Sequence, residues 1–527
     1  MSDLTGRREG LLRWVIAELG PREDELGDRQ SDLHGVRPWA LNHARLELGE
    51  DLEKANAWFE TFALDQEPRV WGDGVADTAD WDFPATQVLR TLLNFADSPR
   101  LSDRARERLT RVFTEWDQPR KGQNRDNDRV HRYPAIHTEN HDIMCLTIGL
   151  FGCVLGGRDA SAHVAQLHDS LSMRFRRGWT EWHSPCYQVH YQAPLLILAD
   201  HAPDPALRRS AEALANVQLA ERAALSVGGY LGGPFQRGYD PHHTNDRADG
   251  FLPAFWQAFG LPDEADALKP IGVQFAASRF IPHPVVAALA ALPARTPLAH
   301  HRGTRDCSRQ KRELPRRTIC YWNTPHVSMG SLNIVGRAHQ ARFFNVLFAA
   351  DPSKSVRTYL HDPEQTSPWE PRREMGAVVQ HEGWLIARGR LVEEGGLSAT
   401  RVGPFNLYRV GRGLCAHAAL AEGLHLFQVG DLDLHADEQA FLATLSMPRL
   451  EDGSVRGRSP DGHDLLVELD DMSLTVDGRP GHDWSDKLHA GPWLDADWDR
   501  GEVAVTAGGE RAVFSARGIE QDNSRTH

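Results

Sequence analysis

The stretch AEALANVQLAERAAL, residues 211–225, repeats apolar side chains at the spacing of a helix face. Polar or proline-containing breaks such as Asp97-Ser98-Pro99 and Ala202-Pro203-Asp204-Pro205 separate it from similar stretches among the first 292 residues. The others lie at residues 11–19, 88–95, 109–113, 143–155 and 195–199. We therefore expect about ten helices with no strands between them. Because no heptad repeat links them, we expect helical hairpins arranged in a ring or a solenoid.

After Thr318 the helical spacing gives way to short apolar runs that are typical of β-strands. The clearest runs lie at residues 341–348, 383–388, 405–410 and 464–469. Turn signals such as Glu451-Asp452-Gly453 separate them, which predicts an antiparallel β-sandwich. The intervening segment is rich in arginine and histidine, so we expect either a solvated linker or a basic flap that faces the substrate. The expected organisation is α+β, with a helical domain at 1–292, a linker at 293–317 and a sheet domain at 318–527.

Composition limits the classes of function. The chain has 527 residues, 41% apolar and 25% charged, as expected for a globular protein with more than one domain. A net charge of −14 argues against nucleic-acid binding, because phosphates attract basic surfaces. No apolar run approaches the roughly 20 residues of a membrane span, and the first residues do not resemble a secretion signal. The six cysteines lack CxxC spacing, which argues against a zinc knuckle or a disulfide framework. We expect a cytoplasmic protein with neither nucleic acid nor membrane as a partner.

A first cluster of reactive side chains, Thr138-Glu139-Asn140-His141-Asp142, stands at the start of a predicted helix. Thr138 is a favourable N-cap residue, which would place the next residues at the positive end of the helix dipole. Such a position suits a carboxylate and the negative charge that grows when the neighbouring carbon loses a proton. Asn140 can donate hydrogen bonds, and His141 can donate one or take the proton. The simpler interpretation is that both side chains only help to cap the helix.

A second cluster begins with Ser184 as N-cap and Pro185 at the first helical position. This start would place Tyr187 in the first turn, with His190 and Tyr191 about one turn later on the same face. A tyrosine at a helix start can act as a general base when ionised and as a general acid when neutral. Alternatively, both tyrosines are packing residues.

A third cluster spans residues 228–243 and is too rich in glycine and proline for a regular helix. Loops of this composition often carry functional groups, although ordinary surface loops share it. Arg237 could bind a sugar carboxylate with its guanidinium group, and Tyr239 could stack on a sugar ring. His242 and His243 are adjacent and would point in different directions, which makes them a weak metal-site signal.

Two of these stretches carry a family resemblance. Glu139-Asn140-His141 is similar to the carboxylate-neutralising element of the heparinase II/III-like and alginate-lyase-like polysaccharide lyases. The run GWTEWHSPCY at residues 178–187 is similar to the segment that supplies their catalytic tyrosine. The whole chain resembles these enzymes in its order of helical region, linker and sheet region. The resemblance implies an N-terminal incomplete (α/α) toroid followed by a C-terminal antiparallel β-sandwich.

The resemblance also implies β-elimination in uronic-acid-containing glycans. Asn140 and His141 would neutralise the uronate carboxylate, Tyr187 would be the base or acid, and an acidic oligo- or polysaccharide would be the substrate. The remaining residues expected to bind the substrate are Glu139, His190, Tyr191, Arg237, Tyr239 and His242. The chemistry needs no cofactor. Members of this group often hold a structural divalent metal in the β domain, for which His326 and His381 are the candidate positions, and a sandwich with free edges could form a homodimer.

Other interpretations remain open. A glycoside hydrolase on the same helical scaffold needs two carboxylates, and Glu139, Asp142, Glu181 and Asp240 all lie in the polar clusters. A uronate epimerase would share the first proton abstraction. A non-catalytic carbohydrate-binding protein would use some of the 15 tryptophans for stacking, although tryptophan is also ordinary core material.

Overall fold

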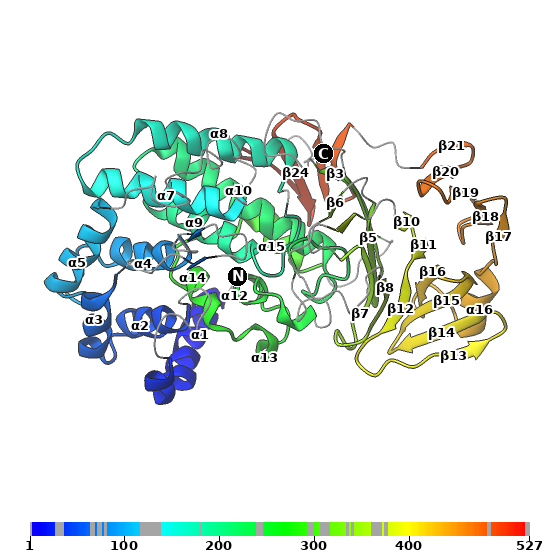
Figure 1. The fold of residues 1–527 in the computed structure, drawn as a ribbon, viewed down its shortest axis with the longest axis horizontal. Helices are drawn as coiled ribbons and strands as arrows, with labels where there is room; N and C mark the ends of the chain where they lie inside the picture. The colour runs from blue at the N-terminus through cyan, green and yellow to red at the C-terminus, as the bar shows by residue number, and fades with distance from the viewer. Residues whose placement is uncertain are drawn as a thin grey trace.

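The protein divides into an N-terminal helical region and a C-terminal region dominated by antiparallel sheets (Figure 1). The computed structural model describes residues 3–26, 36–63, 69–70, 76–77, 82–115, 139–179, 181–238, 246–292, 299–305, 317–333, 337–338, 342–359, 372–373, 378–481 and 486–521. Among these residues, no helix is both long enough and apolar enough to cross a lipid bilayer. The predicted order, with helices first and antiparallel sheets after them, is confirmed at this coarse level.

Each helical stretch predicted from apolar spacing coincides with a helix of the structure, and only Phe95, the last residue of the stretch at 88–95, lies just beyond its helix. The α-helices of the N-terminal region are α1 (Leu4–Leu19), α2 (Val36–Leu48), α3 (Leu52–Thr61), α4 (Asp82–Asn94), α5 (Asp103–Thr114), α7 (Glu139–Leu155), α8 (Ser161–Arg177), α9 (Gln188–His201), α10 (Pro205–Leu225), α12 (Leu252–Phe259), α13 (Glu264–Ala267), α14 (Val273–Ala276) and α15 (Pro284–Ala290). Short 3₁₀ helices are η1 (Gly20–Glu25), η3 (Asp246–Ala248) and η4 (Pro270–Gly272). Helices that follow each other in the chain, such as α1 and α2 or α9 and α10, pack against each other.

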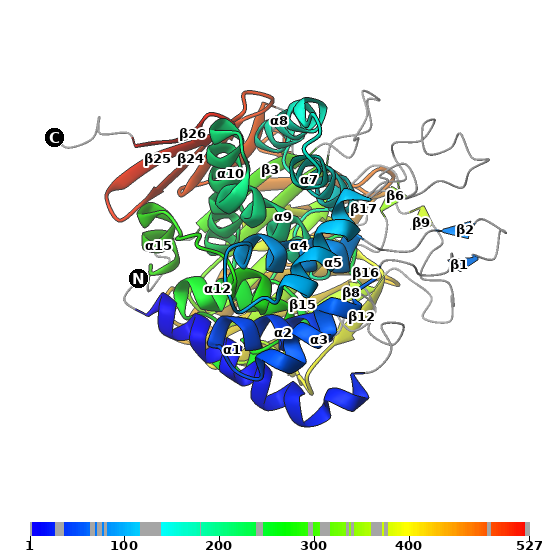
Figure 2. The ribbon, with the colours of Figure 1, turned by 90° about the vertical axis from the view of Figure 1, so that its left-hand side faces the viewer.

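Helix α10 contains the apolar stretch at residues 211–225. Its start is stabilised by Asp204, whose carboxylate accepts hydrogen bonds from the backbone N–H groups of Ala206 and Leu207, and by Pro205 at the first position. From Ala213 onward every side chain of the helix is buried. It packs against α8, α9 and α15 and also against β25 (Glu510–Ser515) and β26 (Gly518–Gln521), so it lies where the helices meet the C-terminal strands (Figure 2).

The strands are β1 (Arg69–Val70), β2 (Ala76–Asp77), β3 (Ala299–Arg305), β4 (Arg317–Asn323), β5 (Val327–Asn333), β6 (Arg337–Ala338), β7 (Phe344–Phe348), β8 (Ser355–Tyr359), β9 (Arg372–Arg373), β10 (Val378–His381), β11 (Trp384–Arg388), β12 (Arg390–Glu393), β13 (Thr400–Val402), β14 (Phe405–Val410), β15 (Gly413–Ala421), β16 (Leu424–Asp431), β17 (Arg449–Glu451), β18 (Ser454–Arg458), β19 (Asp464–Glu468), β20 (Ser473–Val476), β21 (Arg479–Pro480), β22 (Lys487–Ala490), β23 (Leu494–Asp497), β24 (Glu502–Ala507), β25 (Glu510–Ser515) and β26 (Gly518–Gln521). A single helix, α16 (Glu438–Thr444), lies among the described strands.

Three larger antiparallel sheets follow the helices in the described residues, and β6 and β9 form a separate two-stranded pair. In the described residues the first sheet has the order β12-β8-β7-β5-β4-β3-β22-β23-β24-β25-β26, the second β10-β11-β16-β15-β14-β13 and the third β17-β18-β19-β20-β21. The main core joins the helices to β4, β5 and β22–β25 of the first sheet. A second core lies between the first and second sheets, and a third lies between the second and third sheets. The second sheet is therefore buried on both faces.

Strand β11 illustrates this two-sided burial. Leu385 and Ala387 belong to the core shared with the first sheet, whereas Trp384 and Ile386 belong to the core shared with the third. Successive side chains of a strand point to opposite faces, so a strand covered on both sides needs a continuous apolar run. That is why the sequence shows such a run here instead of a polar and apolar alternation.

Two expectations from the sequence differ from the structure. Strands β1 and β2 pair within the helical region, where we expected none. Residues 299–305, inside the predicted linker at 293–317, form β3, which pairs with β4 over its whole length. The segment lacks an apolar pattern, and its strand conformation depends on hydrogen bonds to β4, a partner that a local pattern does not reveal.

Candidate functional site

The starts of α4 and α7 bring an aspartate and a histidine together. Asp82, the first residue of α4, lies 2.5 Å from Nδ1 of His141 in the first turn of α7. The Asp82 carboxylate is fully buried, and the His141 side chain is 19% exposed. An ionised carboxylate only accepts hydrogen bonds, so Nδ1 of His141 must carry the shared hydrogen, and Nε2 is left to accept or donate a proton elsewhere.

Phe83 is the hub of an aromatic cluster beside this pair. Its ring meets His141 edge-on at 5.2 Å between centroids and His190 edge-on at 4.4 Å. The ring of Tyr187 lies 6.2 Å away, in a tilted arrangement. Helices α4, α7 and α9 contact one another in pairs, so the two polar clusters singled out in the sequence converge on one side chain from a third helix.

Tyr187 lies against a guanidinium group. The Arg237 guanidinium carbon is 5.0 Å from the centre of the Tyr187 ring, and its Nη2 donates to the phenol oxygen at 3.4 Å. The helix start differs by a few residues from the expectation, because α9 begins at Gln188 and Tyr187 is its N-cap residue. Ser184 still organises the turn, since its Oγ accepts a hydrogen bond from the Tyr187 backbone N–H at 3.0 Å.

Arg237 is held in an uncommon backbone conformation. Its φ angle is +56°, a left-handed conformation that usually costs about 1–3 kcal/mol for a residue other than glycine and persists where the surroundings impose it. Ser184 Oγ donates to the Arg237 carbonyl at 3.0 Å, and the Gln236 N–H donates to the Trp182 carbonyl at 3.0 Å. The loop is thereby tied to the segment that leads into α9.

The same loop is clamped from the sheet region. Arg342 Nη2 donates to the Gly233 carbonyl at 2.9 Å, and the backbones of Arg342 and Phe235 form an isolated bridge. A Cβ atom on Gly233 would lie only 2.1 Å from the Tyr321 ring, which explains the glycine at this close approach. Burial raises the pKa of Tyr321, so it remains a neutral phenol, and its hydroxyl donates to the Pro234 carbonyl at 3.3 Å. Both regions therefore set the position of Arg237.

Two buried carboxylates lie behind these groups. Glu139 forms an ion pair with Arg174 and also accepts a hydrogen bond from the Glu181 N–H at 3.1 Å. Glu181 accepts a hydrogen bond from the Tyr191 hydroxyl and lies 3.4 Å from Nε of Arg237. These contacts link the α7 start, the segment before α9 and the Arg237 loop in one network.

The other residues expected at the site differ in their surroundings. Asn140 is fully buried in the first turn of α7, and His190 is buried against Phe83. Tyr191 is buried and stacked on Trp179 with 4.6 Å between ring centroids and 4° between ring planes, so in this structure it supports Glu181. Thr138, Tyr239, Asp240, His242 and His243 lie outside the described residues.

The structure adds residues that sequence reasoning missed. Asp82 and Phe83 open α4, and Arg174 lies near the end of α8, where it pairs with Glu139. An acidic residue at a helix start and a basic residue near a helix end are common for reasons of the helix dipole alone. Their positions in the sequence therefore gave no indication of a functional role. Only the packing of α4 and α8 around α7 shows that these residues lie beside the candidate site.

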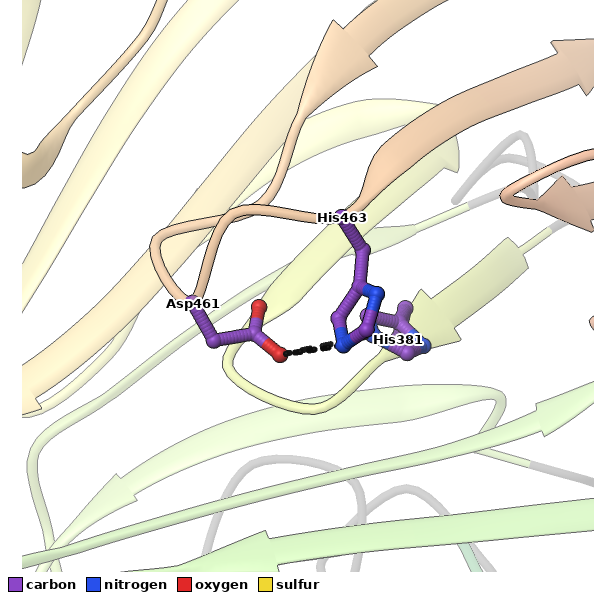
Figure 3. Close-up of side chains that lie close together, drawn as sticks. All are labelled: His381, Asp461 and His463. Carbon is purple, nitrogen blue, oxygen red and sulfur yellow. Dashed lines mark ion pairs between the residues drawn. The ribbon is translucent and has the colours of Figure 1, made fainter.

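The two candidate metal positions in the sheet region, His326 and His381, have different neighbours. His326 Nε2 lies 2.7 Å from the Asp433 carboxylate, which also pairs with Arg412. His381 instead lies close to Asp461 and His463, and one ligand atom from each lies within 4.8 Å of the others (Figure 3). Of the two positions, His381 is the one with the neighbours that a metal site needs.

Comparison with known proteins leaves the geometry as the basis for assigning a function. No protein-family model matches this chain, and a search of curated proteins finds no significant match.

Proposed function

We propose that this chain is a lyase that cleaves uronic-acid-containing oligo- or polysaccharides by β-elimination. The observation that carries the proposal is the convergence of the Asp82–His141 pair and the Tyr187–Arg237 pair around Phe83. Elimination next to a carboxylate needs a positively polarised site for that carboxylate, a base for the C5 proton and an acid for the leaving oxygen. The described residues contain a group for each task.

The carboxylate of the uronate would bind at the start of α7. Asn140 and His141 lie in its first turn, where the helix dipole favours negative charge. Arg237 adds a full positive charge, which matters for an acidic substrate because the chain itself carries a net charge of −14. The same groups would stabilise the charge that spreads onto the carboxylate when C5 loses its proton.

Proton transfer would use His141 and Tyr187. Because Asp82 holds Nδ1 of His141, Nε2 is the nitrogen that would exchange the proton, and the buried carboxylate would stabilise the imidazolium that forms. Positive charge from Arg237 beside the Tyr187 oxygen likewise favours a phenolate. Either group can remove the C5 proton, and Tyr187 in its neutral form protonates the glycosidic oxygen on C4. The C5–H and C4–O bonds break and a C4=C5 double bond forms. The sugar bonded through the C4 oxygen leaves with a new hydroxyl group, and the ring that lost its C5 proton becomes the unsaturated uronate.

The hydrolase alternative has less support. Hydrolysis needs two carboxyl groups that can reach the glycosidic bond, one of them as a proton donor. Glu139 is paired with Arg174, and Glu181 accepts a hydrogen bond from Tyr191 with Arg237 nearby. Both carboxylates already have cationic neighbours, which favour their ionised form and oppose the role of general acid.

We also propose the finer architecture that such an enzyme would use, an incomplete (α/α) toroid next to an antiparallel β-sandwich. The packing of successive helices as pairs supports the toroid. The apolar core between the first and second sheets supports the sandwich. An acidic glycan is the proposed partner, and a homodimer through the outer strands is compatible with this arrangement.

The test is ultraviolet absorbance during incubation with a panel of uronate oligosaccharides, because only elimination creates a conjugated double bond. Wild-type protein should give a rising signal, and Tyr187→Phe should abolish it. Tyr408→Phe, which removes a hydroxyl that donates to Glu393 at 2.5 Å in the sheet region, is the matched control and should retain activity. New reducing ends without absorbance would instead establish hydrolysis, and exchange of the C5 proton with solvent without cleavage would establish epimerisation.

A further inference from the structure

Glu181 is a buried carboxylate beside the candidate site, and the proposed proton transfer does not use it. Its side chain is 8% exposed, and its Oε1 lies 3.4 Å from Nε of Arg237. A second nitrogen of the same guanidinium group, Nη2, donates to the Tyr187 hydroxyl oxygen at 3.4 Å. Arg237 therefore contacts a carboxylate through one nitrogen and a phenol through another.

The carboxylate of Glu181 is held in one position. Its Oε2 accepts a hydrogen bond from the Tyr191 hydroxyl, and the Tyr191 ring is stacked on Trp179. The backbone N–H of Glu181 donates to Oε2 of Glu139 at 3.1 Å. Turning the carboxylate away from Arg237 would be costly, because the Tyr191 hydroxyl would lose this acceptor in a buried environment.

Arg237 is restricted as well. Its φ angle is +56°, and the Ser184 hydroxyl donates to its carbonyl at 3.0 Å. The guanidinium carbon lies 5.0 Å from the centre of the Tyr187 ring. Because both charged groups are held in place, their combined effect on Tyr187 is a fixed property of the folded chain.

The two charges act on the Tyr187 hydroxyl in opposite directions. The positive charge of Arg237 stabilises the phenolate, whereas the negative charge of Glu181 destabilises it. Tyr187 is only 7% exposed, so solvent screens neither charge well. Because the guanidinium group contacts the hydroxyl directly, Arg237 has the larger effect and Glu181 offsets part of it.

The helices packed around Tyr187 bring other ionisable side chains near it. The ring centroid of His190 in α9 lies 6.4 Å from that of Tyr187. Asp82 and His141 form their own pair at the starts of α4 and α7. A substitution at Glu181 leaves these groups unchanged, so it tests the contribution of that carboxylate alone.

We propose that Glu181 is a positioning residue that holds Arg237 in place and offsets its charge, so that Tyr187 keeps its proton to higher pH. The inference rests on the proposed lyase function, in which neutral Tyr187 protonates the glycosidic oxygen. Without the carboxylate, Arg237 would favour the phenolate more strongly, and a phenolate has no proton to donate. Glu181 would thus set the pH range in which Tyr187 can act as the acid.

The experiment follows the ionisation of Tyr187 in the full-length chain without substrate. Tyrosine labelled with carbon-13 at the ring carbon that bears the hydroxyl gives one NMR signal per tyrosine, and Tyr187→Phe identifies the signal of this residue. Its titration midpoint should lie about one pH unit lower in Glu181→Gln than in the wild type, because glutamine keeps the shape of the side chain and removes its charge. Glu181→Asp, which keeps the charge, should restore most of the difference.

Glu393→Gln is the matched control. Glu393 also accepts a hydrogen bond from a tyrosine, Tyr408, at 2.5 Å, but in the sheet region, so this variant should leave the Tyr187 midpoint unchanged. In the elimination assay, the fall of kcat at alkaline pH should begin about one pH unit lower in Glu181→Gln than in the wild type. A purely structural role would instead lower kcat equally at every pH.

A Tyr187 midpoint that is unchanged or higher in Glu181→Gln would overturn the proposal. If that variant does not fold, Glu181→Met removes the same charge with a side chain of similar length and takes its place in the titration. Because the titration needs no substrate, the two proposals fail separately. A wild-type protein that eliminates nothing would refute the lyase function, and the titration would still decide whether Glu181 acts on Tyr187.

Discussion

The helical region and the sheet region place their reactive side chains by opposite means. In the helical region the candidate site is assembled from helix starts that lie up to 105 positions apart, from Asp82 to Tyr187, and most of its groups are buried. In the sheet region both faces of the second sheet are filled with apolar side chains, so polar groups gather in the turns, as at Asp461 and His463. The buried polar groups of this protein therefore depend on helix packing for their positions, whereas the exposed ones depend on strand connections.

This difference predicts separable effects. Substitutions at the helix starts should change the reaction more than stability, and substitutions inside the sheets should change stability more than the reaction. A substitution where the two regions meet should change both.

The largest effect is expected for Asp82→Asn. An asparagine amide could donate to Nδ1 of His141, which would hold the ring in the wrong tautomer and remove the charge that supports the imidazolium. We expect kcat to fall by about 100–10,000-fold with little change in KM. Steady-state kinetics on a uronate oligosaccharide measures both constants.

Asp103→Asn, at an exposed aspartate on α5, is the control and should leave kcat within a factor of two or so of wild type. An Asp82→Asn enzyme with wild-type kcat would remove the Asp82–His141 pair from the mechanism.

An intermediate effect is expected for Gly233→Ala, where the sheet region contacts the loop that carries Arg237. The added Cβ would lie 2.1 Å from the Tyr321 ring, so the loop must move, at a cost of about 1–3 kcal/mol in unfolding free energy. Because Arg237 moves with the loop, activity should also fall. Chemical denaturation measures the loss of unfolding free energy, and kinetics on the same preparation measures the loss of activity.

Gly228→Ala is the matched control in the same loop. Its φ angle is +58°, but nothing lies within 4 Å of the added Cβ, so the substitution costs only backbone strain of about 1 kcal/mol. If both glycine variants keep full activity, the position of Arg237 does not depend on the close packing against Tyr321.

The smallest effect is a pH dependence of stability inside the sheets. Burial lowers the pKa of His417 from its ordinary 6.5 to about 4, with a further contribution from the neighbouring His425. The unfolded chain therefore binds a proton at this position between pH 6.5 and 4 while the folded chain does not. Stability is fully present above pH 6.5 and is lost as pH falls toward 4. Thermal unfolding across this range should show a midpoint that falls with acidification.

His417→Gln should remove part of that fall, and the activity of the variant at neutral pH should be unchanged. His201 in α9 provides the comparison in the helical region, since burial, together with the charge of Arg90, lowers its pKa to about 4 as well. If the thermal midpoint of His417→Gln falls as steeply with acidification as that of the wild type, His417 does not contribute to the pH dependence of stability.

Much of the fold could be predicted because local patterns decide it. Helix α10 has a capping aspartate, a proline at its first position and helical apolar spacing, and all three signals agree. Strand β11 was recognisable from its continuous apolar run. Strand β3 was not, because its basic segment becomes a strand only through pairing with β4.

The residues of the candidate site also fall into two groups, those that the sequence indicates and those that it does not. Asn140, His141 and Tyr187 could be selected from the sequence, because polar residues at predicted helix starts stand out against an apolar pattern. Asp82, Phe83 and Arg174 could not, since each has an ordinary local role at the end of its own helix.

Local patterns in the chain dictate most of its helices and strands and put polar groups at their ends, because capping, turn chemistry and apolar periodicity act over a few neighbouring residues. That Asp82 meets His141, Arg237 meets Tyr187 and His381 meets His463 depends instead on folding in three dimensions. Those pairings depend on which helices and sheets pack together. That choice is made by the burial of whole apolar faces, which no short stretch of sequence contains.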